Sequence, residues 1–148
     1  MNNRVLVLFL CFICALTFTS CSKNSITKTD KSNIKYVDIY DVVHEAFLTN
    51  DGYTDKLSKH MSKDVFNSIT YTKHHYPPQY SKPFKVDFTL KEISQTKEND
   101  LVYVDMIYSR IIKDANGKDV SGSWNVPIRF TVKSTANDWY IINKYEKP

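Results

Sequence analysis

The stretch that decides the fold is residues 84–144, which read FKVDFTLKEISQTKENDLVYVDMIYSRIIKDANGKDVSGSWNVPIRFTVKSTANDWYIINK. Apolar and polar residues alternate from Lys85 to Lys91, which is the period-two pattern of a half-buried strand. The segment from Gln95 to Asp100 is polar and carries an Asn-Asp turn signal. The pattern therefore predicts a first strand followed by a tight turn.

Three further strands follow in the same stretch. Leu101 to Ile112 is apolar on both alternating sets, which is typical of a central strand covered on both sides. After an Asn-Gly turn, Val120 to Lys133 is the cleanest amphipathic strand, and Trp139 to Lys144 is the last. Pro127 lacks an N–H, so we expect it where the third strand is unpaired or bulged. Short connections favour an antiparallel meander.

Helices are predicted before this sheet. Apolar residues at helical spacing predict a helix from Asn33, its cap, to Leu48. Thr54 or Asp55 would cap a second short helix that carries Leu57 and Met61. Ser62 would cap a third helix, whose buried face is Val65, Phe66 and Ile69. Residues 71–83 contain three prolines and are expected to be irregular.

Helices followed by long antiparallel strands define an α+β fold, with N-terminal helices packed on a curved antiparallel sheet of about four strands. This order, and the ending Asn137 to Ile142, resemble the cystatin-like, cone-shaped superfamily that includes nuclear transport factor 2 and the ketosteroid isomerases. The resemblance covers residues 34–145. It implies a pocket between sheet and helices, used as an enzyme site, a ligand site or a filled core. It also implies a dimer or partner contact on the opposite sheet face.

The first 20 residues are predicted to be a signal peptide. Arg4 precedes an uncharged apolar run from Val5 to Phe18, which is short for a membrane span of ~20 apolar residues. An uncleaved N-terminal anchor is the alternative. Phe18-Thr19-Ser20-Cys21 resembles a bacterial lipobox, although Phe replaces the usual Leu or Val. This resemblance implies that Cys21 becomes lipid-modified, with residues 21–32 as a flexible tether and residues 33–148 as the domain.

Composition excludes several function classes. Cys11 and Cys14 would leave with the signal peptide and Cys21 would carry lipid, so no thiol chemistry, disulfide or zinc–cysteine site is expected in the domain. The net charge of +4 is too mild, and too little clustered, to indicate nucleic-acid binding. The chain has only three glycines and no catalytic sequence motif, so no cofactor site is predicted.

A few polar residues are candidates for a site. Asp105 lies mid-strand among apolar residues; pointing into the cone, it would have a raised pKa and act as a base. It could equally face solvent, or pair with Arg110 or Arg129. Asp41 and His44 share a face of the first helix, as an acid–base pair or simply as solvated side chains.

The proline-rich loop holds the remaining candidates. Its aromatic residues would contact a ligand or a partner by stacking, or would fold back and plug the open end of the sheet. His74-His75 does not predict a metal site, because adjacent side chains in an extended segment point apart and no third ligand is evident. Trp124 and Trp139 are interpreted as core or sheet-face residues. The loop candidates are Tyr71, His74, Tyr76 and Tyr80.

Three functions are compatible with these patterns. The first is an envelope lipoprotein that acts as a binding or protein-interaction module, with an envelope protein or a second copy docked on the sheet face. The second is a small-ligand carrier or isomerase-like pocket enzyme that places Asp105, His44 and the loop tyrosines around one cavity. The third is an accessory subunit of an envelope secretion or conjugation machine, docked through the exposed face of Ser121 to Lys133.

The lipid anchor gives a direct prediction. Each buried CH₂ contributes ~0.8 kcal/mol, and two acyl chains hold a protein on a membrane where one does not. Cys21→Ser should therefore shift the protein from the membrane pellet to the soluble fraction of lysed cells. Fractionation with immunoblotting measures this shift. A variant that stays in the pellet after a high-salt wash would show that lipid on Cys21 is not the anchor.

Overall fold

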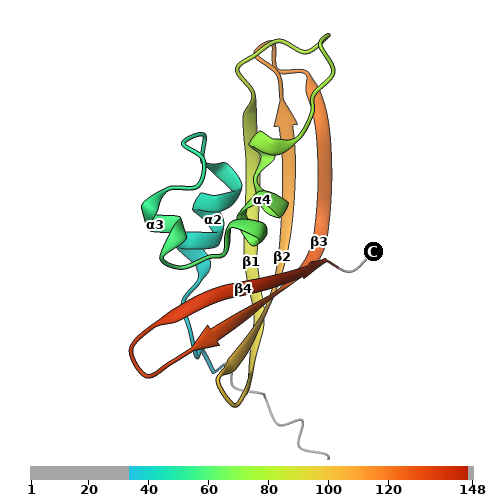
Figure 1. Cartoon of the computed structure of the whole chain (residues 1–148). Coiled ribbons are helices and arrows are strands. Elements are labelled where there is room, and N and C mark those ends of the chain that lie inside the picture. The colour runs from blue at the N-terminus through green and yellow to red at the C-terminus, as the bar shows by residue number, and fades with distance from the viewer. Residues whose placement is uncertain (1–33, 147–148) are drawn as a thin grey trace, which may run out of the picture. The chain divides into compact units, whose positions relative to one another are not determined.

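A computed structural model describes residues 34–146 of the 148-residue chain. The predicted signal peptide, the lipidation of Cys21, the tether and the Asn33 cap lie outside the described residues. Within them the fold is α+β, with short helices packed on a curved antiparallel sheet, as the sequence predicts (Figure 1). No helix in this range is long and apolar enough to cross a membrane.

The sheet has four strands in the order β1-β2-β3-β4, with every neighbouring pair antiparallel. The predicted meander is therefore confirmed. Because β4 pairs with β3 only from Ile128 to Ser134, the end of the sheet beside residues 70–84 has three strands (Figure 1). The strand bounds are β1 Lys85–Glu98, β2 Leu101–Lys113, β3 Asp119–Ser134 and β4 Trp139–Glu146.

The first strand is longer than its apolar pattern suggests. Gln95 to Glu98 continue β1 and pair with the start of β2, ending in the pair Glu98 and Leu101. The turn is confined to two residues, and Asn99 adopts the left-handed conformation at φ 56° that such a turn requires. Polar side chains are tolerated here because cross-strand hydrogen bonding, not burial, holds this end of β1.

Strand β2 is central, but residues 34–146 cover it on one side only, which differs from the two covered faces that the sequence predicts. Its even-numbered residues Val102, Val104 and Met106 are buried in the core beneath the helices. We call this side of the sheet the inner face, and the opposite side the outer face. The odd-numbered residues on the outer face are only half-buried; they are Leu101, Tyr103, Asp105 and Ile107.

A bulge divides β3 into two halves. Tyr108 pairs with Val126 but Arg110 pairs with Ser123, so Trp124 and Asn125 oppose a single residue of β2. Asn125 adopts φ 49° at this point. The extra residue turns Trp124 to the outer face, where it is 67% exposed, so its expected place in one continuous apolar face is wrong. It is a sheet-face residue, one of the two placements predicted for it.

Pro127 confirms the prediction made for it. It pairs in register with Ile107 of β2, while the β4 ladder begins one residue later at Ile128. The side of β3 that faces β4 therefore has no ladder partner at Pro127.

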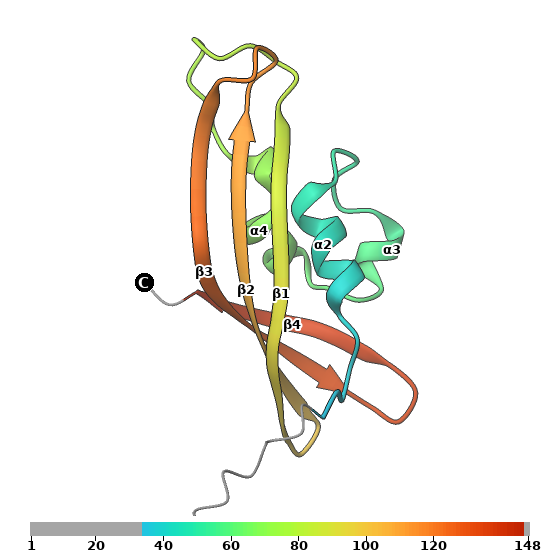
Figure 2. The same ribbon diagram turned by 180° about the vertical axis from the view of Figure 1, so that it is seen from behind.

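The helices lie on the inner face, as Figures 1 and 2 show from opposite sides. Thr54 and Ser62 cap α3 and α4 by accepting hydrogen bonds from Leu57 and Val65, which confirms both predicted caps. Residues Val65, Phe66 and Ile69 form the predicted buried face of α4. The bounds are α2 Tyr40–Leu48, α3 Asp55–Ser58, α4 Lys63–Ile69 and the 3₁₀ helix η2 Tyr71–Lys73.

Helix α2 begins at Tyr40, seven residues after the predicted start at Asn33. The preceding residues are extended because the Gln95 side chain of β1 holds their backbone. Its Oε1 accepts from the N–H groups of Tyr36 and Val37 at 2.8 and 3.1 Å, and its Nε2 donates to the Val37 carbonyl at 2.8 Å. Val37 and Ile39 are buried, so this segment closes the core beside α2.

The segment between α3 and α4 forms backbone hydrogen bonds with β4, along the edge that does not pair with β3. The Ile141 N–H donates to the His60 carbonyl at 2.8 Å, and the Ser62 N–H donates to the Ile141 carbonyl at 3.0 Å. The hydroxyl of Tyr140 donates to the Met61 carbonyl at 2.9 Å, and the Trp139 ring stacks on His60 at 4.5 Å. The edge strand is therefore protected along this segment.

We predict that Gln95→Leu destabilises the domain by about 1–3 kcal/mol, because it leaves buried backbone groups of Val37 without partners. Urea denaturation of the full chain in detergent, followed by circular dichroism, measures the free energy of unfolding. Gln79→Leu is the matched control, since Gln79 is exposed in the proline-rich loop. Equal stabilities of the two variants would show that the Gln95 contacts do not hold the segment.

Candidate functional site

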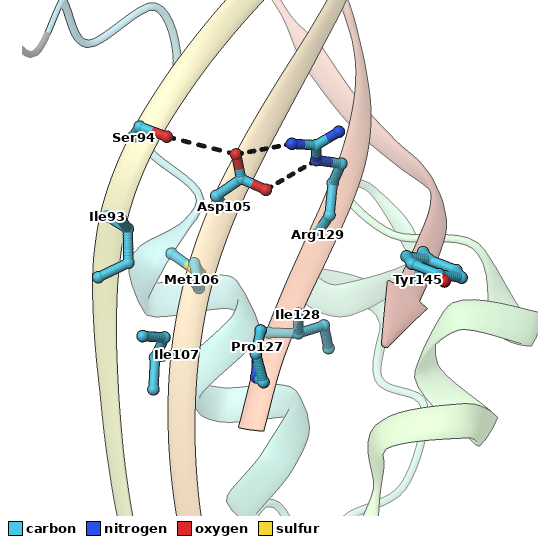
Figure 3. A pocket seen from close by; sticks show the side chains of 9 residues that line it. All are labelled: Ile93, Ser94, Asp105, Met106, Ile107, Pro127, Ile128, Arg129 and Tyr145. Carbon is cyan, nitrogen blue, oxygen red and sulfur yellow. Dashed lines mark hydrogen bonds and ion pairs between the residues drawn. The ribbon is translucent and has the colours of Figure 1, made fainter. Parts of the chain in front are cut away.

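The outer face of the sheet carries an open groove of about 410 Å³ (Figure 3). It crosses all four strands, because β1, β2 and β3 supply its floor and Tyr145 of β4 stands at its edge. Its lining is mostly apolar, with one charged pair at one end. The lining residues are Ile93, Ser94, Asp105, Met106, Ile107, Pro127, Ile128, Arg129 and Tyr145.

The charged pair joins Asp105 and Arg129, which face each other across β2 and β3. Arg129 donates to the two carboxylate oxygens from Nε at 2.7 Å and from Nη2 at 2.9 Å. Ser94 Oγ donates from β1 at 3.3 Å, so the three side chains form a row across the sheet (Figure 3). The hydrogen bonds that Arg129 donates to Asp105 raise the pKa of Arg129 above its ordinary value.

Asp105 therefore does not point toward the helices, and the expectation that it lies in an apolar pocket is wrong. It lies on the outer face, and the alternative of a pair with Arg129 is the one observed. The guanidinium contacts both carboxylate oxygens, so it fixes the orientation of the Asp105 side chain on the sheet. Since Arg129 is half-exposed, we assign the pair at most about 1 kcal/mol of stability.

Apolar side chains surround this pair on the outer face. Trp124 is 67% exposed, Tyr145 is 59% exposed and Ile93 is 41% exposed. Ile93 is displaced outward because it is the extra residue of a bulge in β1. A second hollow of about 590 Å³ lies beside Trp124 and Ile111 on the same face. The described helices α2, α3 and α4 pack on the opposite, inner side of the sheet (Figure 2).

Asp41 and His44 form no hydrogen bond or ion pair with each other in the part of the chain that the structure describes. The His44 ring instead stacks on Tyr40 at 5.8 Å and meets the edge of Phe88 at 5.4 Å. It lies on the inner side of the sheet, opposite Asp105. The expectation that Asp105 and His44 surround one cavity is therefore wrong.

The loop tyrosines fold back on the protein, the second of the two predicted arrangements. Tyr71 is buried and its hydroxyl donates to the Asn50 side chain. The Tyr76 hydroxyl donates to the Tyr71 carbonyl at 2.8 Å, and the Tyr76 ring packs on Phe84 at 4.3 Å. The ring of Tyr80 lies 5.3 Å from the ammonium of Lys118. Burial raises the pKa values of Tyr71 and Tyr76, so both hydroxyls stay protonated.

These tyrosines nevertheless leave a hollow of about 520 Å³ between the loop and the start of β1. His74 and His75 both line it. Among residues 34–146, no group of three His, Cys, Asp or Glu side chains is placed to hold a metal ion. The lining residues are Asn50, Tyr71, Thr72, His74, His75, Tyr76, Lys82, Pro83 and Phe84.

Sequence reasoning missed Lys82 and Asp114, which both lie at this end of the sheet. No pattern distinguishes Lys82 from other surface lysines. Asp114 does have a signal, because it opens the predicted Asp-Ala-Asn-Gly turn, where an Asp side chain accepts from the backbone two residues on.

No protein-family model and no curated protein matches this chain.

The buried carboxylate of Asp114 holds the proline-rich loop to the β2–β3 turn. Oδ1 accepts from the N–H groups of Asn116 and Lys118, both at 2.9 Å, and Oδ2 accepts from Ser81 at 3.4 Å. Desolvation acts to raise the pKa of Asp114, but the backbone N–H groups of Lys118, Ser81 and Asn116 outweigh it. The pKa therefore lies below its ordinary value.

This lowered pKa makes a pH-dependent contribution to stability. The contribution is complete above the unfolded-state pKa of about 4 and is lost as the pH falls through the lower folded-state value. Asp114→Asn should lower the melting temperature of the full chain at pH 7, and the gap from wild type should narrow below pH 4. Thermal scans from pH 7 to pH 3 measure this difference in melting temperature. Asp100→Asn, in the exposed β1–β2 turn, is the control. A gap independent of pH would contradict this account.

Proposed function

We propose that the protein is a lipid-anchored envelope lipoprotein that acts as a protein-interaction module through the outer face of its sheet. The sequence around Cys21 supports the anchor and the export that it requires. The observation that carries the interaction is the uncovered outer face, with its exposed aromatic and aliphatic side chains.

The chemistry of the outer face suits contact with another protein. Protein interfaces are enriched in aromatic residues, Met and Arg, and their centres are depleted of unpaired charge. Here the charges of Arg129 and Asp105 neutralise each other at 2.7 Å, and those of Lys113 and Asp87 do so at 2.8 Å. Trp124 and Tyr145 stand exposed on the same face, so a docking partner would bury aromatic area beside these neutralised pairs.

The proposed partner is an envelope protein or a second copy of this chain. The resemblance to the cystatin-like superfamily supports this choice through element order, because such folds use this face for dimer or partner contacts. An accessory role in a secretion or conjugation machine would use the same face, with Ser121 to Lys133 at its centre. The isomerase-like alternative loses its principal support, since Asp105 and His44 lie on opposite faces of the sheet.

Photo-crosslinking in intact cells tests this function. A benzophenone amino acid at Ile107 or Tyr145, on the outer face, should give one dominant protein adduct. The same amino acid at Asn67, which is exposed on α4 on the inner side of the sheet, should give at least about tenfold less adduct. The mass of the adduct distinguishes a second copy from another protein. Equal or absent adducts at all three positions in a correctly folded protein would refute docking on the outer face.

A further inference from the structure

The hollow behind the proline-rich loop has walls of two kinds. One is aromatic, formed by Tyr71, Tyr76 and Phe84, with the Pro83 ring beside them. The other is polar, formed by the side chains of Asn50, Thr72, the two histidines and Lys82. Its volume of about 520 Å³ is in the range of sites that hold small organic molecules.

The aromatic wall is fixed in place before any ligand arrives. The hydroxyl of Tyr71 is bonded to Asn50 and that of Tyr76 to the Tyr71 carbonyl, so neither ring is free to turn. Phe84 packs against Tyr76 at 4.3 Å and leads directly into β1, the rigid edge of the sheet. A preorganised wall loses little conformational entropy on binding, and ring faces favour a planar apolar group.

The charge of the hollow is positive. No acidic residue is among its lining residues, and Lys82 forms no ion pair with any residue of the range 34–146. Arg110 lies close enough behind the loop that its charge lowers the pKa of His74, in addition to desolvation, which is the larger cause. Asp114, nearby in the fold, has its oxygens turned to backbone N–H groups.

We propose that this hollow binds a small organic anion with a planar ring. The anionic group, a carboxylate or a phosphate, would sit against Lys82, and the ring would lie along Tyr76 and Phe84. His74 and Asn50 would supply hydrogen bonds. An anion fits better than a cation because every formal charge that the lining offers is positive, and better than a neutral ligand because Lys82 has no carboxylate partner in the hollow.

This ligand site is separate from the outer face. The loop hollow lies at the three-stranded end, whereas the groove of Asp105 and Arg129 lies where β3 pairs with β4 (Figures 1 and 3). The two proposals therefore fail independently, since crosslinking on the sheet does not report on the hollow.

Nuclear magnetic resonance titration of the full chain, ¹⁵N-labelled and held in detergent micelles, tests the proposal. The probes are benzoate, phenyl phosphate, inorganic phosphate and the neutral benzyl alcohol. Benzoate or phenyl phosphate should shift the amide signals of Thr72, His74, Lys82 and Phe84 at millimolar concentration. The tighter of the two identifies the preferred anionic group. Benzyl alcohol and inorganic phosphate should each bind at least about tenfold more weakly, because each lacks one half of the ligand.

Lys82→Met should weaken binding of the preferred anion at least about tenfold, as expected for loss of a charge-assisted contact. Lys91→Met makes the same change of charge on the outer face and should leave binding unchanged. The spectra also show whether each variant is folded. The proposal is overturned if no probe shifts these signals, if benzyl alcohol binds as tightly as benzoate, or if Lys82→Met and Lys91→Met behave alike.

Discussion

The structure depends on one constraint, which is that its central strand is apolar on both sides while its helices cover only one. Val102, Val104 and Met106 bury against the helices and form the core. Tyr103 and Ile107 project from the opposite side of the same strand. Their apolar surface stays partly exposed to water, which is unfavourable unless another surface covers it. Strands β1 and β3 place Ser94, Arg129 and other polar side chains beside them. The outer face is therefore partly polar and partly apolar. A sheet built in this way is suited to being covered by another protein.

Irregularities in the ladders decide where that apolar surface is displayed. The bulge at Ile93 brings an aliphatic side chain to the outer face, and the bulge at Asn125 does the same for Trp124. Without the second bulge, strict alternation would keep Trp124 on the face of Val126, which packs against the core. Bulges recur at functional positions because they re-aim a side chain without disturbing the strands on either side. Both of them here turn large apolar residues toward the same side of the sheet.

The sequence predicted the features that depend on neighbours in the chain. Strand alternation, the Asn-Gly turn and the caps Thr54 and Ser62 are local, and the structure confirms them. Two errors share a different cause, because each depends on residues far away in the sequence. The first helix starts late because Gln95, almost sixty positions downstream, holds the backbone of Tyr36 and Val37 extended. The side on which Asp105 lies depends on which set of β2 residues meets the helices, and both sets are apolar enough for either choice.

Charged side chains are arranged differently on the outer face and at the loop end, which suits the two regions to different binding partners. On the outer face, Asp105 and Arg129 pair in register, and the groove beside them presents mostly apolar area. At the loop end, Lys82 has no carboxylate among the residues that line the hollow, and Asp114 accepts from backbone N–H groups of the β2–β3 turn. A surface with much exposed apolar area favours contact with a protein partner, whereas a positive hollow favours a small anion.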